Sequence, residues 1–254
     1  MDIIKKLAQE LAIKEEQAKA AVQLIDEGNT IPFIARYRKE MTGALNDETL
    51  RNLHERLLYL RNLEEKKEQV INAITDQGKM TEDLKKKILS AETLVAVDDL
   101  YRPYRPKKQT RATKAKEKGL EPLANILLLQ KTTKSMEEEA AAFVNAEKGV
   151  ANAKEAIAGA KDIIAEMIAD MADYRKSIRN CTMKQGSLVV KAKDEKAESV
   201  YAMYYDFREP LSKVTGYRVL AINRGEKEKF LTVKVEAPDV QIVNALNKTM
   251  VKDN

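Results

Sequence analysis

The sequence predicts a mainly α-helical protein: an elongated multi-helix scaffold with a helix-turn-helix-like N-terminal part and a small β-hairpin near the C-terminus. Charged residues make up 33% of the 254 residues, aromatic residues make up 5%, and tryptophan is absent. This composition is typical of amphipathic helices rather than of a β-sandwich. Apolar residues recur at helical spacing as far as Met171, and the alternation typical of strands begins only after Gly186.

Three short helices are expected at the N-terminus. Apolar residues at helical spacing predict helices over residues 3–11 and 14–27. Gly28 favours an end to the second helix, because glycine accepts the left-handed backbone of a C-terminal cap. Thr30 can cap a third helix, and Pro32 fits its first turn, where no backbone donor is needed. Short helices joined by tight turns predict a helix-turn-helix-like unit.

A long helix is expected next, with Asn46 as its N-cap and its end near Thr75. One apolar stripe at helical spacing predicts it, formed by Leu50, Leu53, Leu57, Leu60, Leu63, Val70 and Ile74. A shorter helix is expected over residues 81–91. The segment around Pro103 and Pro106 is expected to be extended, because proline pushes the residue before it out of the helical region.

The chain is expected to turn helical again after Gly119. Residues 120–129 form a short apolar segment typical of a buried helix. Ser135 and Glu138 match a capping box, in which each side chain satisfies an exposed backbone donor near the other. Residues 153–171 carry alanine, isoleucine and methionine along one face, which predicts a helix that packs closely against its neighbours.

The pattern changes after Gly186. Residues 187–193 predict a short strand, and residues 197–207 predict a helix. Residues 219–236 alternate on both sides of a glycine-containing turn, which predicts a β-hairpin. The final segment, 242–254, has an amphipathic pattern.

The positive charge is concentrated in one segment, residues 102–118. This segment holds eight basic residues and one acid, a net charge of +7. The remainder of the chain holds 37 basic and 39 acidic residues, so its net charge is −2 and the whole chain carries +5. A local cluster of this kind attracts polyanions better than scattered charge does.

Two segments are therefore candidates for contact with nucleic acid. In the stretch YRPYRPKK, arginine and lysine can neutralise phosphates, and tyrosine can stack on bases. The alternative is a basic linker whose tyrosines pack on the protein and whose arginines pair with local acids. A second basic cluster lies on or just after the third helix, in the stretch RYRKE. The alternative interpretation of this stretch is a helix end held by salt bridges. The candidate residues are Tyr101, Arg102, Tyr104, Arg105, Lys107, Lys108, Arg111 and Lys114 in the first segment, and Arg36, Arg38 and Lys39 in the second.

No catalytic residue, metal site or cofactor is predicted. His54, the single histidine, lies within the leucine-striped helix, where a surface or edge position is the better interpretation. Cys181, the single cysteine, excludes an intramolecular disulfide and is interpreted as a half-buried thiol. The Asp98–Asp99 pair is too small a set of oxygen ligands for a metal, so helix capping or pairing with Arg102 is expected. No run of about 18 apolar residues occurs, so no membrane span is predicted. The single cysteine suits a protein of the reducing cytoplasm.

Three segments together carry a family resemblance. TIPFIARYRKEMTGALND (30–47), VDDLYRPYRPKKQTRATKAKEKGLEPLA (97–124) and FREPLSKVTGYRVLAINRGEKEKFL (207–231) closely resemble bacterial Tex proteins, the transcription accessory family. The resemblance implies a helical scaffold with helix-turn-helix-like parts and cytoplasmic nucleic-acid binding linked to transcription. Family members continue with an RNase H-like domain, helix-hairpin-helix elements and an OB-fold domain, so the chain is expected to be an N-terminal fragment.

These observations predict a non-enzymatic scaffold that binds RNA and/or DNA without sequence preference, with RNA polymerase as a further partner. The alternative is a protein-interaction scaffold that docks RNA polymerase or the protein's own missing domains. Three regions are expected: an N-terminal helical domain over 1–108, a second helical region over 109–185, and strands, a helix and a hairpin over 186–254 that lead toward an RNase H-like domain.

Overall fold

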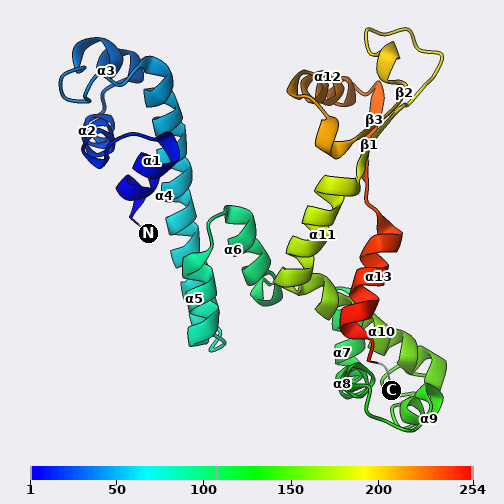
Figure 1. Ribbon diagram of the computed structural model, residues 1–254. Coiled ribbons are helices and arrows are strands. Elements are labelled where there is room, and N and C mark those ends of the chain that lie inside the picture. The colour runs from blue at the N-terminus through cyan, green and yellow to red at the C-terminus, as the bar shows by residue number, and fades with distance from the viewer. Residues whose placement is uncertain (1, 107, 253–254) are drawn as a thin grey trace. The chain divides into compact units, whose positions relative to one another are not determined.

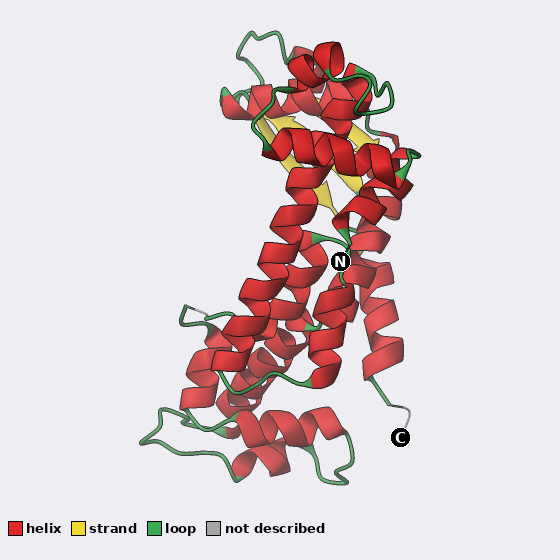
Figure 2. Ribbon diagram, turned by 90° about the vertical axis from the view of Figure 1, so that its left-hand side faces the viewer, coloured by secondary structure: helices red, strands yellow, loops and turns green. Residues whose placement is uncertain are grey.

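The computed structural model describes residues 2–106 and 108–252, which form two compact units, Met1–Arg105 and Pro106–Asn254. Within the described residues there are thirteen α-helices and three strands, so the prediction of a mainly α-helical fold is confirmed (Figures 1 and 2). No helix in this described part of the chain has the length and apolar character needed to cross a membrane.

The N-terminal unit is built on one long helix. The five helices predicted for this unit are confirmed, and the structure adds a sixth over residues 94–101 that the sequence did not predict. Its elements are α1 (Ile3–Leu11), α2 (Glu15–Asp26), α3 (Ile31–Tyr37), α4 (Asp47–Asp76), α5 (Glu82–Ser90), α6 (Leu94–Tyr101) and the 3-10 turn η1 (Arg102–Tyr104). The Asn46 side chain caps α4 as predicted, because its Oδ1 accepts from the amide of Thr49 at 2.7 Å. Thr30 occupies the N-cap position of α3 without a side-chain cap bond, and Pro32 lies in the first turn.

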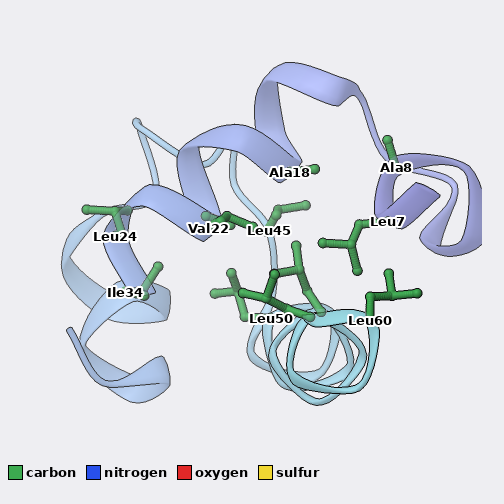
Figure 3. Packing of buried hydrophobic residues seen from close by; sticks show 12 residues of the cluster. Leu7, Ala8, Ala18, Val22, Leu24, Ile34, Leu45, Leu50 and Leu60 are labelled. Carbon is green, nitrogen blue, oxygen red and sulfur yellow. The ribbon is translucent and has the colours of Figure 1, made fainter. Parts of the chain in front are cut away.

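Two hydrophobic cores share helix α4. Helices α1, α2 and α3 pack on its first half, where Leu50 and Leu60 are fully buried (Figure 3). Helices α5 and α6 pack on its second half, where Leu63 and Ile74 are fully buried. The predicted apolar stripe of α4 therefore holds both cores together through one continuous element.

The expectation of an extended segment around Pro103 and Pro106 is wrong at the first proline. Arg102 has helical angles, φ −52° and ψ −42°, and the chain continues from α6 into η1. The turn stays helical because Tyr104 packs against the core of α4 to α6, and the Gln77 side chain donates to the Tyr104 carbonyl oxygen at 3.0 Å. Arg105, which precedes Pro106, is extended as predicted, with φ −65° and ψ 133°.

The second unit contains a helical part and a small sheet. Its elements are α7 (Arg111–Glu117), α8 (Glu121–Leu129), α9 (Met136–Ala141), α10 (Ala153–Asp170), α11 (Ala172–Gln185), β1 (Ser187–Ala192), η2 (Ala202–Tyr204), β2 (Asp206–Pro210), η3 (Leu211–Lys213), α12 (Gly216–Lys227), β3 (Leu231–Glu236) and α13 (Asp239–Met250). Helices α7, α8 and α9 pack around α10, and the capping box of Ser135 and Glu138 is confirmed at the start of α9.

Helix α13 runs beside α11, away from the sheet (Figure 1). Its end is attached to the end of α8, because the Gln130 side chain donates to the Met250 carbonyl oxygen at 2.7 Å. Lys252 adds a second bond, from its Nζ to the Leu129 carbonyl oxygen at 2.9 Å. These contacts connect the last helix with the helical part of the same unit.

The predicted β-hairpin over 219–236 is wrong. Residues 216–227 form helix α12, and only the second half of the expected hairpin, β3, is a strand. The strand order is β2-β1-β3 and both pairs are antiparallel, so β3 pairs with β1 and not with its neighbour in sequence. Ile222 and Gly225 face the sheet, where a Cβ on Gly225 would lie 2.6 Å from Leu231 Cδ1. Helix α12 therefore packs closer to β3 than a larger residue would allow.

The predicted helix over 197–207 is also wrong. This segment forms the short turn η2 and then enters β2 at Asp206. Tyr201 and Tyr204 are buried in the same core as Val190 and Leu231 of the sheet. Their three-residue spacing places both rings on one side of the short turn η2, so the spacing does not require a long helix.

Candidate nucleic-acid interface

The loop after α3 is held by buried polar contacts. Thr42 is fully buried, and its hydroxyl group donates to the carbonyl oxygen of Arg38 at 3.2 Å. Gly43 has a φ of +61°, which favours glycine, and a Cβ there would lie 2.7 Å from the Gln17 side chain. Gln17 Nε2 donates to the Gly43 carbonyl oxygen at 2.9 Å. These contacts fix the backbone that follows the RYRK sequence.

This fixed backbone presents cations and two apolar side chains to solvent. Arg36, Arg38 and Lys39 are exposed, with Tyr37 at 59% and Met41 at 52% exposure. The guanidinium group of Arg38 lies 5.0 Å from the ring centre of Phe33, and that of Arg36 lies 5.9 Å from the Tyr37 ring centre. A hollow of about 350 Å³ is lined by residues 36–41. We call this surface the RYRK loop.

The cations of the RYRK loop differ from the other arginines of the N-terminal unit in their pairing. Among the described residues, none of Arg36, Arg38 and Lys39 forms an ion pair with a carboxylate. Four other arginines of this unit do form such pairs: Arg51 with Asp47, Arg56 with Glu10, Arg61 with Asp26 and Arg105 with Asp98. The RYRK loop is therefore a set of three exposed cations without an ion pair in the part of the chain that the structure describes, beside one exposed acid, Glu40, that also lines the hollow.

The first part of the 102–118 segment lies in the N-terminal unit. Tyr101 and Tyr104 are half-buried and pack against the core of α4 to α6. Arg105 pairs with Asp98 at 2.7 Å and lies 5.6 Å from the Tyr101 ring centre. Arg102 is exposed. The two tyrosine faces are thus partly covered by the protein itself, as the alternative interpretation of this segment expected.

The second part of the segment begins the next unit. Lys107 lies outside the described residues. Lys108 is exposed, as are Arg111 and Lys114 on helix α7. The Arg111 side chain is 87% exposed and its Nε lies 3.5 Å from Asp162 Oδ1, whereas Lys114 has no carboxylate partner among the described residues. The ten candidate residues that the structure describes therefore fall in two units, seven in the N-terminal unit and three in the second unit.

The remaining chemically active side chains do not converge. His54 and Cys181 are half-buried. Asp98 pairs with Arg105, and Asp99 is buried. Across residues 2–106 and 108–252, no three histidine, cysteine, aspartate or glutamate side chains form a group that could hold a metal ion.

Sequence reasoning missed a second basic run on helix α11 and strand β1. Residues 174–193 contain six basic residues and no acid: Arg175, Lys176, Arg179, Lys184, Lys191 and Lys193. Lys176 and Lys184 are exposed on α11. Acids elsewhere in the chain offset these six charges, so the net charge of the chain outside residues 102–118 does not indicate the run. The net charge of each successive short segment would have indicated it.

The fold and these surfaces define a helical scaffold that carries exposed, unpaired cations. Residues 1–75 match the Tex-like protein N-terminal domain, and residues 131–253 match the Tex central region-like family. The chain therefore belongs to the Tex family and contains its N-terminal and central regions.

Relatives from bacteria and from humans align with nearly the whole chain. The uncharacterized protein YdcI of Bacillus subtilis is 43% identical over 250 residues, which are 97% of this chain and 35% of that protein. The transcriptional accessory protein Tex of Neisseria gonorrhoeae is 41% identical over 93% of this chain and 31% of its own length. The human S1 RNA-binding domain-containing protein 1 is 33% identical over 94% of this chain and 24% of its own length. The chain thus spans about a third of the length of the bacterial relatives it matches.

Proposed function

We propose that this chain is a non-enzymatic scaffold of a transcription accessory protein, and that it binds RNA and DNA without sequence preference in the cytoplasm. The observation that carries this proposal is the RYRK loop, whose three exposed cations have no carboxylate partner in the described part of the chain.

The chemistry of the loop suits a phosphate backbone. Arginine and lysine bind phosphates and release counterions, which gives affinity that is independent of sequence. Tyr37 exposes most of its ring beside these cations and can stack on an unpaired base. Helices α2 and α3 then form the helix-turn-helix-like element that presents this contact.

The 102–118 segment supplies further contacts in this proposal. Its phosphate ligands are Arg102, Arg105, Lys107, Lys108, Arg111 and Lys114. Tyr101 and Tyr104 act by positioning the segment, because their rings pack against the core of α4 to α6. The names of two relatives support the setting: one is a transcriptional accessory protein, and the human protein is named for an S1 RNA-binding domain.

Fluorescence anisotropy of labelled single-stranded RNA and duplex DNA across a salt series tests the proposal. We expect the combined variant Arg36→Glu, Arg38→Glu and Lys39→Glu to lose about tenfold or more in affinity at low salt. The slope of log affinity against log salt should also become shallower, by roughly 0.7 for each lost contact to a single strand.

The matched control is Lys85→Glu, Lys86→Glu and Lys87→Glu on α5, which changes the charge of three exposed lysines in the same unit. If both triple variants lose the same affinity, only the total charge matters and the RYRK loop is not a binding site. Absence of binding by the unaltered chain at low salt would contradict the proposed function itself.

A second candidate function is a protein-interaction scaffold that docks RNA polymerase or the further domains that the family resemblance implies. Exposed apolar residues on α12 favour it, since Tyr217 is 65% and Leu220 is 72% exposed. Replacing both with serine should weaken capture of purified RNA polymerase or of the separately made C-terminal domains. It should leave nucleic-acid affinity unchanged, which distinguishes the two functions.

A further inference from the structure

A hollow of about 280 Å³ lies between helices α7 and α10 in the second unit. We propose that it holds one nucleotide of a single strand, with the base on its apolar floor and the phosphate on the cations of α7. This inference rests on the proposed function and adds a particular site and a preference for unpaired strands. The volume of the hollow lies just below the roughly 300–1,000 Å³ of pockets that bind drug-sized ligands, which suits a ligand as small as one base.

The floor of the hollow is made of small and aliphatic groups, including Ala115, Leu120, Val150 and Ala158. Gly159 lets α10 approach both α7 and the start of α8, because a Cβ there would lie 3.3 Å from Ala115 Cβ on α7 and 2.4 Å from Cδ1 of Leu120, the N-cap of α8. Ala158 is exposed at this place, so no large side chain fills the space above the floor. The result is an apolar surface of the kind on which the flat face of a base can rest.

The cations lie on one side of this floor. Arg111, Lys114 and Lys118 follow one another at three- and four-residue spacing, which places them on one face of the helix end. Lys118 is fixed, since its Nζ donates to the Gly149 carbonyl oxygen at 2.8 Å. Lys114 has no carboxylate partner in the described part of the chain and is available to a phosphate.

The hollow also contains two carboxylates, Glu155 and Asp162. Glu155 Oε2 accepts from the Ala151 amide at 3.0 Å, and Asp162 lies 3.5 Å from Arg111. Carboxylates repel a phosphate but accept hydrogen bonds from the exocyclic amino group of a base. Cations and carboxylates around one apolar floor therefore fit the two ends of a nucleotide better than they fit an isolated anion.

A duplex cannot use this site without cost. A paired base is stacked between its neighbours and must be extruded from the duplex to reach the floor. Extrusion costs the free energy of unpairing and unstacking that base, so a duplex gains less affinity from this site. A single strand already exposes its bases and can place one in the hollow. The site should therefore contribute to single-strand affinity and leave duplex affinity unaffected.

Filling the hollow tests the proposal. We expect Ala158→Trp to weaken binding of an oligocytidylate RNA by about five- to tenfold, the lower part of the range for contacts to one base, because this floor lacks an aromatic ring. Affinity for duplex DNA of equal length should stay within about twofold. The matched control is Ala165→Trp, at another exposed alanine of α10 that does not line the hollow.

The outcomes separate this inference from the proposed function. Circular dichroism and urea unfolding of both tryptophan variants establish that α10 remains folded. If Ala158→Trp and Ala165→Trp both leave single-strand affinity unchanged while the RYRK loop variant loses it, the hollow is not a site and the proposed function stands. Equal losses for single strand and duplex would also overturn the inference, because they would indicate a general effect on the surface. If the unaltered chain binds neither nucleic acid, both proposals fail.

Discussion

Thr42 shows how a single buried residue can control a surface. Its hydroxyl group donates to the Arg38 carbonyl oxygen, and it lies within 3.4 Å of the Lys39 carbonyl oxygen. Because the side chain is fully buried, the hydroxyl group has no water to replace these acceptors. The same two carbonyl oxygens also accept from the backbone amides of Thr42 at 3.1 Å and Ala44 at 2.7 Å. The hydroxyl group therefore adds a side-chain contact to the backbone turn that carries Arg38 and Lys39.

We expect Thr42→Val, which keeps the shape but removes the donor, to lower the free energy of unfolding by about 1–2 kcal/mol. Under the proposed function it should also weaken RNA binding, because the cations are no longer held in one arrangement. Urea unfolding and anisotropy measure the two effects. The control is Thr75→Val, an exposed threonine whose hydroxyl donates to Ile71 at 2.8 Å, for which little change is expected. Equal effects of both substitutions would contradict this role for Thr42.

Helix α4 is joined to its neighbours by two bidentate ion pairs. Arg56 donates to both oxygens of Glu10 on α1, and Arg61 donates to both oxygens of Asp26 on α2. Hydrogen bonds from these arginines lower the pKa of Glu10 below its ordinary value of 4.5 and the pKa of Asp26 below 3.8, although partial burial opposes both shifts. The folded protein therefore binds protons at these sites more weakly than the unfolded chain does.

This difference predicts how stability depends on pH. The stabilisation from both carboxylates is complete above their ordinary pKa values and is lost as the pH falls through the lower values of the folded state. Urea unfolding between neutral pH and about pH 3.5 should show a falling free energy of unfolding. The double variant Glu10→Gln and Asp26→Asn should be less stable at neutral pH and show a smaller fall.

The control for this prediction is Glu55→Gln with Glu68→Gln, two exposed acids of α4 that have no partner among the described residues. This variant should keep the pH dependence of the unaltered chain. If the control flattens the curve as much as the double variant does, then general charge repulsion causes the effect rather than the two ion pairs.

At the scale of the whole molecule, each unit has its own hydrophobic cores. The two cores around α4 belong to the N-terminal unit, and the cores around α10 and the sheet belong to the second unit. A segment with its own core can fold alone. The boundary falls at Arg105 and Pro106, inside the basic segment that the sequence presents as continuous.

We expect chains 1–105 and 106–254, made separately, to fold without each other. Each should show helical circular dichroism and a cooperative urea transition, because neither needs the other to bury its core. An N-terminal piece that unfolds without a cooperative transition would contradict the division. Under the proposed function, the intact chain should bind a long single strand more tightly than either piece, since linkage raises the effective concentration of the second contact.

The sequence by itself determined five of the six α-helices that the structure describes in the N-terminal unit, and it determined the family. The Asn46 cap, the leucine stripe of α4 and the capping box of Ser135 depend on residues three or four positions apart, so a local pattern contains the information. The candidate cations were also found by local charge. Family membership followed from three segments whose order and residues are specific.

Only the tertiary structure decided which distant groups meet. Residues 219–236 alternate like a hairpin, but β3 pairs with β1, and strand pairing is not encoded in local periodicity. Lys67 lies in the apolar stripe of α4 and is buried because Glu64 and the Leu89 carbonyl oxygen accept from it. Likewise, the arginines of the RYRK loop and the other arginines of the N-terminal unit cannot be told apart by charge in the sequence, since each carries one positive charge. Their availability to a ligand differs because ion pairing depends on which acids the fold brings within reach.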